Sequence, residues 1–154
     1  MEEITFSEII SYAKIAEDNA MKFYLDAAAN ATQSNVKELL EALAAQEKKH
    51  KEYLEELGTK LKAAGTVPAV HEKVQSLGYA KMIEPQTLDA DSDYKDVIEV
   101  AMQKEKEAIE TYETLFHYVE DPDAKKLFEL LLEEERKHLS QFEKEYEDLQ
   151  DQRN

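Results

Sequence analysis

The chain contains no cysteine, and this absence excludes several kinds of chemistry at once. Disulfide bonds, thiolate zinc sites, thiol nucleophiles and cysteine-ligated iron–sulfur clusters all require that side chain. Any metal ion must therefore be bound through nitrogen and oxygen atoms.

Turn-forming residues are also scarce, since the 154 residues include only three glycines and three prolines. A sheet of many strands needs frequent turns, so this scarcity favours long helices. The hydrophobic fraction of 42% suffices for a core at this length, and the charged fraction of 35% is expected for helices with solvated outer faces. The composition predicts one all-α domain covering residues 1–154.

Basic residues are far fewer than acidic ones, which gives the chain a formal net charge of -16. Such a surface repels phosphate backbones and anionic lipids, so nucleic acid is not an expected partner. No apolar run approaches the length that crosses a membrane, and the N-terminus MEEITFSEII carries acids where a secretion signal carries basic residues. We therefore expect a cytoplasmic protein with no membrane partner.

Four segments carry apolar residues at helical spacing. We expect the helices at about residues 6–31, 35–63, 94–120 and 122–149. Thr5-Phe6-Ser7-Glu8 reads as a capping box before the first helix, and Asp121-Pro122 supplies an N-cap and a first-turn proline for the last. The pattern predicts a four-helix bundle built from two antiparallel pairs.

The second and third helices are separated by a long connection, at about residues 64–92, which two glycines and two prolines interrupt. Extended chain advances about twice as far per residue as a helix, so such a connection can run back along the bundle. We expect this crossover to start the third helix at the far end, with a short helix possible at 70–77. The alternative is a disordered or locally folded loop.

Each of the four apolar stripes is interrupted by a glutamate where an apolar residue is expected. These residues are Glu17, Glu47, Glu105 and Glu135. The second and fourth helices also carry a histidine one turn later on the same face, at His50 and His138. The chain therefore contains two Glu-x-x-His pairs.

The two halves of the chain repeat this arrangement at one offset. Glu105 follows Glu17 by 88 residues, and the second Glu-x-x-His pair follows the first by the same interval. Tyr24 and Tyr112 match at this offset, as do two alanines. One Glu-x-x-His pair could arise by chance in so acidic a chain, but the whole repeated set is not easily accidental.

Four other residues fall outside this pattern. His71 and His117 have no glutamate three positions before them, so we expect ordinary surface or loop histidines. Glu133 and Glu134 flank Glu135, but Glu134 lies four residues before the histidine and breaks the repeat. We assign both glutamates to the outer face or to packing edges.

Burying four carboxylates at one level of a bundle would be prohibitive without cations, because each costs several kcal/mol or must take up a proton. Two divalent ions cancel four negative charges, and a neutral imidazole fills one further position on each ion. These arguments predict a site for two metal ions at Glu17, Glu47, His50, Glu105, Glu135 and His138. The alternative is that the helices are rotated so that the glutamates lie at the solvent edge.

The two repeated tyrosines lie seven residues, or two turns, after Glu17 and Glu105. From there the hydroxyl of Tyr24 or Tyr112 could hydrogen-bond a ligand carboxylate of a neighbouring helix and support the site. Simple packing of the two aromatic rings in the core is the alternative.

One glutamate from each of two helices, with Glu-x-x-His from each of the other two, resembles the ligand set of ferritin-like di-iron carboxylate proteins. The chain resembles the rubrerythrin branch of that superfamily over nearly its whole length. The closest local matches are Ala16-Glu17 to Tyr24, Gln46 to His50, Glu105 to Tyr112, and Glu135 to His138.

This resemblance implies a ferritin-like bundle with two iron ions, although the same ligands accept manganese or zinc. It also implies an oxidoreductase that reduces hydrogen peroxide or dioxygen in oxidative-stress defence, and a homodimer. Tyr24 and Tyr112 would then lie beside the metal ligands.

Two departures from rubrerythrins bear on that function. Rubrerythrins usually carry a further glutamate, which exchanges with histidine as iron changes redox state, at the position of Ala108. The remaining set of four glutamates and two histidines is closer to the bacterioferritin pattern. The rubredoxin-like module needs four cysteines, so electrons would come from a separate protein such as a rubredoxin. Two alternatives remain. The chain could be an iron-sequestering protein of the ferroxidase type, or a bundle that bound metals merely stabilise.

Overall fold

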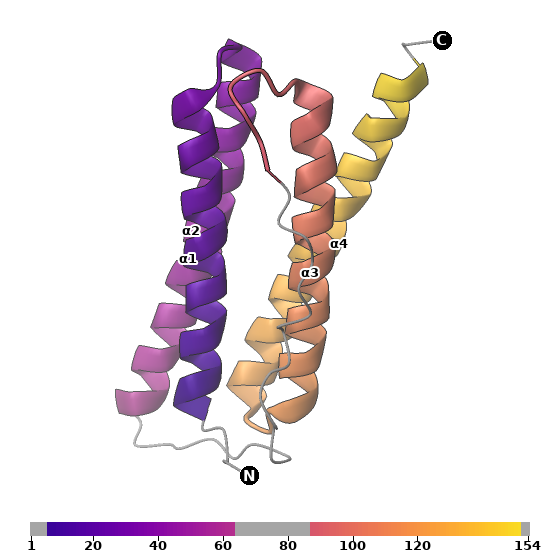
Figure 1. Ribbon diagram of the computed structural model, residues 1–154. Coiled ribbons are helices and arrows are strands. Elements are labelled where there is room, and N and C mark those ends of the chain that lie inside the picture. The colour runs from indigo at the N-terminus through magenta and orange to yellow at the C-terminus, as the bar shows by residue number, and fades with distance from the viewer. Residues whose placement is uncertain (1–5, 64–86, 152–154) are drawn as a thin grey trace.

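The computed structural model describes residues 6–63 and 87–151, and within these ranges the chain forms four helices and no strand (Figure 1). The helices are α1 (Phe6–Asn30), α2 (Ser34–Ala63), α3 (Tyr94–Tyr118) and α4 (Pro122–Asp151). The expected all-α fold is confirmed, and no helix end lies more than two residues from its expected position. In the described part of the chain, no helix is both long enough and apolar enough to cross a membrane.

Side chains fix the starts of the last two helices. Asp93 accepts a hydrogen bond from the backbone N–H of Asp96, whose own carboxylate accepts from the N–H of Asp93. This capping box satisfies two backbone donors that the helix leaves unpaired. Asp121 accepts from the N–H of Ala124, as expected of the N-cap of α4. The capping box predicted at Thr5 begins outside the described residues.

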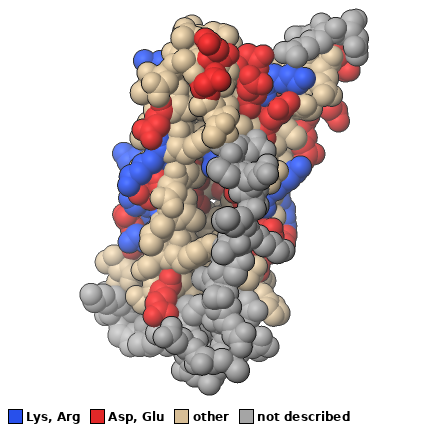
Figure 2. Space-filling view, viewed as in Figure 1, with Lys and Arg blue, Asp and Glu red and all other residues tan. Residues whose placement is uncertain are grey.

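The helices form two antiparallel pairs, α1 with α2 and α3 with α4 (Figure 1). Helix α2 also packs against both α3 and α4, which joins the pairs. Acidic and basic side chains are interspersed along the helices on the face drawn in Figure 2. This distribution agrees with helices that bury one stripe and expose the rest to water.

The core consists of two apolar clusters, one towards each end of the bundle. One includes Ile9, Leu54, Leu115 and Phe128, and the other includes Tyr24, Leu40, Ile98 and Phe142. In every helix, the glutamate singled out from the sequence lies between the residues of the two clusters. The fold therefore places a polar layer inside an otherwise apolar core.

The start of α3 lies beside the turn between α1 and α2. The backbone N–H and the hydroxyl of Thr32 both donate to the carbonyl of Ala90, at 3.2 and 2.9 Å. Helix α2 begins at the same turn and ends about 45 Å away, given its rise per residue. Helix α3 thus starts at the end of the bundle opposite to the end of α2, as predicted. The predicted short helix at 70–77 and His71 lie outside the described residues.

Candidate metal centre

Each helix contributes one glutamate to the polar layer between the two clusters, and α2 and α4 each add a histidine. Glu17, Glu47, His50 and Glu135 offer ligand atoms that all lie within 4.8 Å of one another. Glu105, Glu135 and His138 form a second group by the same measure. The fold therefore brings together all six residues singled out from the sequence, with Glu135 common to both groups.

These side chains are removed from solvent. The four glutamates and His50 have exposed fractions between 0% for Glu135 and 7% for Glu47. His138 is partly buried. The helices are therefore not rotated to place the glutamates at the solvent edge. Burying these carboxylates carries an electrostatic cost that the rest of the layer must offset.

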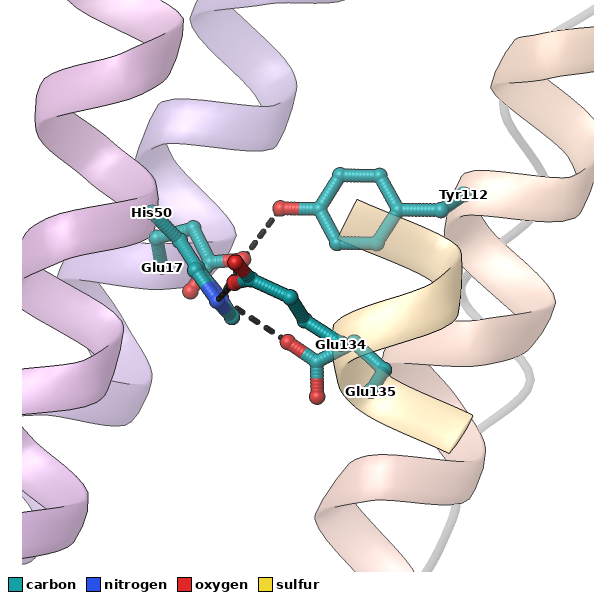
Figure 3. A network of polar contacts seen from close by, with 5 residues as sticks. All are labelled: Glu17, His50, Tyr112, Glu134 and Glu135. Atoms are coloured by element: carbon teal, nitrogen blue, oxygen red, sulfur yellow. Dashed lines mark hydrogen bonds and ion pairs between the residues drawn. The ribbon is translucent and has the colours of Figure 1, made fainter. Parts of the chain in front are cut away.

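His50 is at the centre of the contacts drawn in Figure 3. Its Nδ1 atom lies 2.8 Å from Oε1 of Glu135 and 3.7 Å from Oε1 of Glu17. Its Nε2 atom lies 2.8 Å from Oε2 of Glu134. A carboxylate oxygen accepts hydrogen bonds, so in this contact Nε2 carries the hydrogen atom and donates the hydrogen bond to Glu134. The opposite nitrogen faces the buried carboxylates.

The two predicted tyrosines differ in their contacts. The hydroxyl of Tyr112 on α3 donates to Oε1 of Glu17 on α1 (Figure 3), which is the type of contact predicted for it. The hydroxyl of Tyr24 is buried and has no hydrogen-bond partner among the described residues. Its ring packs in the core, edge-on to Phe23 with centroids 5.6 Å apart. The contacts of Tyr24 match the packing alternative.

Burial and mutual repulsion control the ionisation of the carboxyl groups. Burial raises the pKa of Glu47 well above its ordinary value, and the proximity of Glu17 and Glu135 raises it further. Burial also raises the pKa of Glu135. For Glu17, burial acts in the same direction, but close polar contacts with Glu47 and His50 outweigh it and lower the pKa. Without cations, burial and repulsion thus oppose the ionisation of Glu47, whereas polar contacts favour the ionisation of Glu17.

The two histidines shift in opposite directions. Burial lowers the pKa of His50, but contacts with Glu135 and Glu17 outweigh burial and raise it to about 10. Burial lowers the pKa of His138, and the positive charge of His50 lowers it further. A protonated His50 therefore supplies part of the positive charge that the buried glutamates need.

Several buried atoms of the layer form no hydrogen bond within the described part of the chain. They are one oxygen each of Glu17 and Glu105, both oxygens of Glu135, and Nδ1 of His50 and of His138. Nδ1 of His50 approaches Oε1 of Glu135 closely, as an ion pair, without forming a hydrogen bond. Each unsatisfied buried polar atom costs about 1–3 kcal/mol. Oxygen and imidazole donors in this number fit a pair of divalent cations such as iron, manganese or zinc.

The contact of Glu134 with His50 was not predicted from the sequence. The side chain of Glu134 is 27% exposed, and it contacts His50 instead of lying on the outer face with Glu133, which is exposed. Of the two positions expected for Glu134, the outer face and a packing edge, its partial burial matches the packing edge. The contact with His50 itself was not predicted, because the neighbour of Glu134 on α2 depends on how the helix pairs are rotated. The sequence shows only that Glu134 directly precedes Glu135, a predicted metal ligand. This position does not indicate that Glu134 contacts a histidine on another helix.

The chain is similar to known proteins in sequence and in fold. The family model for rubrerythrin matches residues 8–146. Among solved structures, a hypothetical protein from Pyrococcus furiosus is similar with 26% sequence identity and a TM-score of 0.61, over 94% of this chain and 89% of that one. A search of curated proteins gives no significant match.

Proposed function

The chain belongs to the rubrerythrin family, and from that premise we propose that it is a di-iron oxidoreductase that reduces hydrogen peroxide or dioxygen in oxidative-stress defence. The observation that carries this proposal is the convergence of four glutamates and two histidines in one buried layer. A purely structural layer would not leave so many buried polar atoms without hydrogen bonds.

The ligands divide between two metal positions. In this proposal Glu17, Glu47 and His50 hold one ion, and Glu105 and His138 hold the other, with Glu135 available to both. When bound, two iron ions supply one electron each, and these two electrons with two protons reduce one hydrogen peroxide to two waters. Two ions of charge +2 also balance the four carboxylates.

The remaining residues of the layer prepare the site. The hydrogen bond from Tyr112 holds the Glu17 carboxylate in one orientation. Apolar clusters on both sides of the layer limit the access of water, which favours a small oxidant over a bulky substrate. Because the chain has no cysteine for an iron–sulfur centre, the electrons come from a separate donor protein such as a rubredoxin.

Anaerobic reconstitution with ferrous iron tests the proposal. We expect elemental analysis to find two irons per chain, and peroxide to produce a ferric absorption band that excess reductant reverses over many turnovers. A matched control is Glu129→Ala, which removes an exposed glutamate of α4 and should leave both results unchanged.

The other functions predict different results. Oxidation of bound iron without repeated turnover would indicate sequestration of the ferroxidase type. Metal binding that raises the melting temperature without any redox response would indicate a structural role. Fewer than two ions per chain would contradict the assignment of the ligands.

A further inference from the structure

The two halves of the centre are not equivalent around their histidines. Nε2 of His50 on α2 donates to the carboxylate of Glu134 on α4 at 2.8 Å. At the offset of 88 residues that relates the two halves, the residue matching Glu134 is Gln46. Helix α4 therefore offers a carboxylate to the histidine of α2, whereas α2 carries an uncharged amide at the matching position.

The surroundings of the second histidine fit this difference. The rings of His50 and His138 are nearly parallel, at 16°, with centroids 6.4 Å apart. The side-chain oxygen of Gln46 and Nδ1 of His138 are both buried without a hydrogen bond among the described residues. The two ring planes are thus nearly parallel, but within the described part of the chain only His50 has a carboxylate bound to its outer nitrogen.

The contact with Glu134 determines which nitrogen of His50 is free to bind a cation. Because the carboxylate accepts the proton of Nε2, a neutral imidazole has its lone pair on Nδ1. That atom is the one that faces Glu135 and Glu17, at 2.8 and 3.7 Å. A carboxylate on the outer nitrogen also fixes the ring and makes the inner nitrogen a better donor to a metal.

We propose that Glu134 is a positioning residue that makes the His50 side of the centre bind a metal ion more tightly than the His138 side. The inference rests on the metal centre proposed above. Outer partners of this kind typically change metal affinity by about 10- to 100-fold. Glu134 is 27% exposed, and solvent screening weakens its charge, so we expect the lower part of that range.

A titration of the metal-free, full-length chain with cobalt(II) tests the inference, with calorimetry for affinity and visible absorption for coordination. The wild type should bind two ions in two steps separated by about tenfold or more. Glu134→Gln should weaken the tighter step by a similar factor, so that the two steps converge. Gln46→Glu should strengthen the weaker step and make the halves more alike.

A matched control separates this effect from a simple change in net charge. Glu133→Gln removes the same charge from the neighbouring, exposed residue of α4, and it should leave both steps unchanged. A wild type with two equal steps, or a Glu134→Gln variant that behaves like Glu133→Gln, would overturn the role of Glu134 and leave the metal centre standing. A wild type that binds no cobalt would overturn the centre and this inference together.

Discussion

At the residue scale, Tyr24 and Tyr112 form a matched pair, because only one of their two buried hydroxyls has a hydrogen-bond partner among the residues that the structure describes. Tyr112→Phe removes a hydrogen bond to the charged Glu17, so we expect a loss of about 1.5–3 kcal/mol in the unfolding free energy of the metal-free chain. Tyr24→Phe removes a hydroxyl with no partner among the described residues, and should be neutral or stabilising. Urea denaturation measures both changes, and equal losses would contradict the difference.

Two buried carboxylates can be removed singly to test the ligand assignment. Glu47→Ala and Glu135→Ala should each lose at least one metal ion per chain yet remain folded, because each substitution relieves repulsion in the metal-free layer. Elemental analysis measures the metal, and circular dichroism measures the helix content. Full retention of metal by both variants would refute the assignment.

Protons and metal ions compete for the same atoms. Burial raises the pKa of Glu47 well above its ordinary value, and contacts with Glu135 and Glu17 raise the pKa of His50 to about 10, so both groups hold protons more tightly in the metal-free chain. Both groups must lose these protons to bind a metal, so apparent affinity should increase as pH rises through neutrality. Calorimetry in two buffers with different ionisation enthalpies should detect proton release. Affinity that stays constant from pH 6 to 8 would contradict this.

At the scale of single elements, the start of α3 depends on the capping box of Asp93 and Asp96. Replacing the N-cap in Asp93→Ala should cost about 1 kcal/mol, since a backbone N–H loses its acceptor. Asp91→Ala removes an exposed acid two residues earlier and serves as the control. The loss should be the same with and without metal, because α3 begins far from the polar layer. Urea denaturation of both variants measures it.

At the scale of the whole molecule, the layer of glutamates joins two helix pairs in a chain of net charge -16. Bound cations should hold the pairs together, and a metal at 100 times its dissociation constant should stabilise the fold by about 2.7 kcal/mol. Thermal melts with chelator and with excess metal measure this difference. A monovalent salt of equal ionic strength controls for general screening of the negative charge. No shift beyond that control would contradict a metal-bridged bundle.

The sequence by itself determined the four helices and the level at which the glutamates lie. Helical periodicity places Glu17, Glu47, Glu105 and Glu135 on the apolar stripes. Burying those stripes is what folds the chain, so the glutamates had to enter the core together. The starts of the helices were also predictable where a local cap exists, as at Asp121.

Tertiary structure alone decided which side chains meet across helices. Sequence spacing could not separate Tyr112, which binds Glu17, from Tyr24, which binds no partner among the described residues. Sequence spacing also could not predict that Glu134 contacts His50. Position along one helix fixes a side chain's face, but contact between helices depends on their rotation and axial shift, which the packing of the whole core sets.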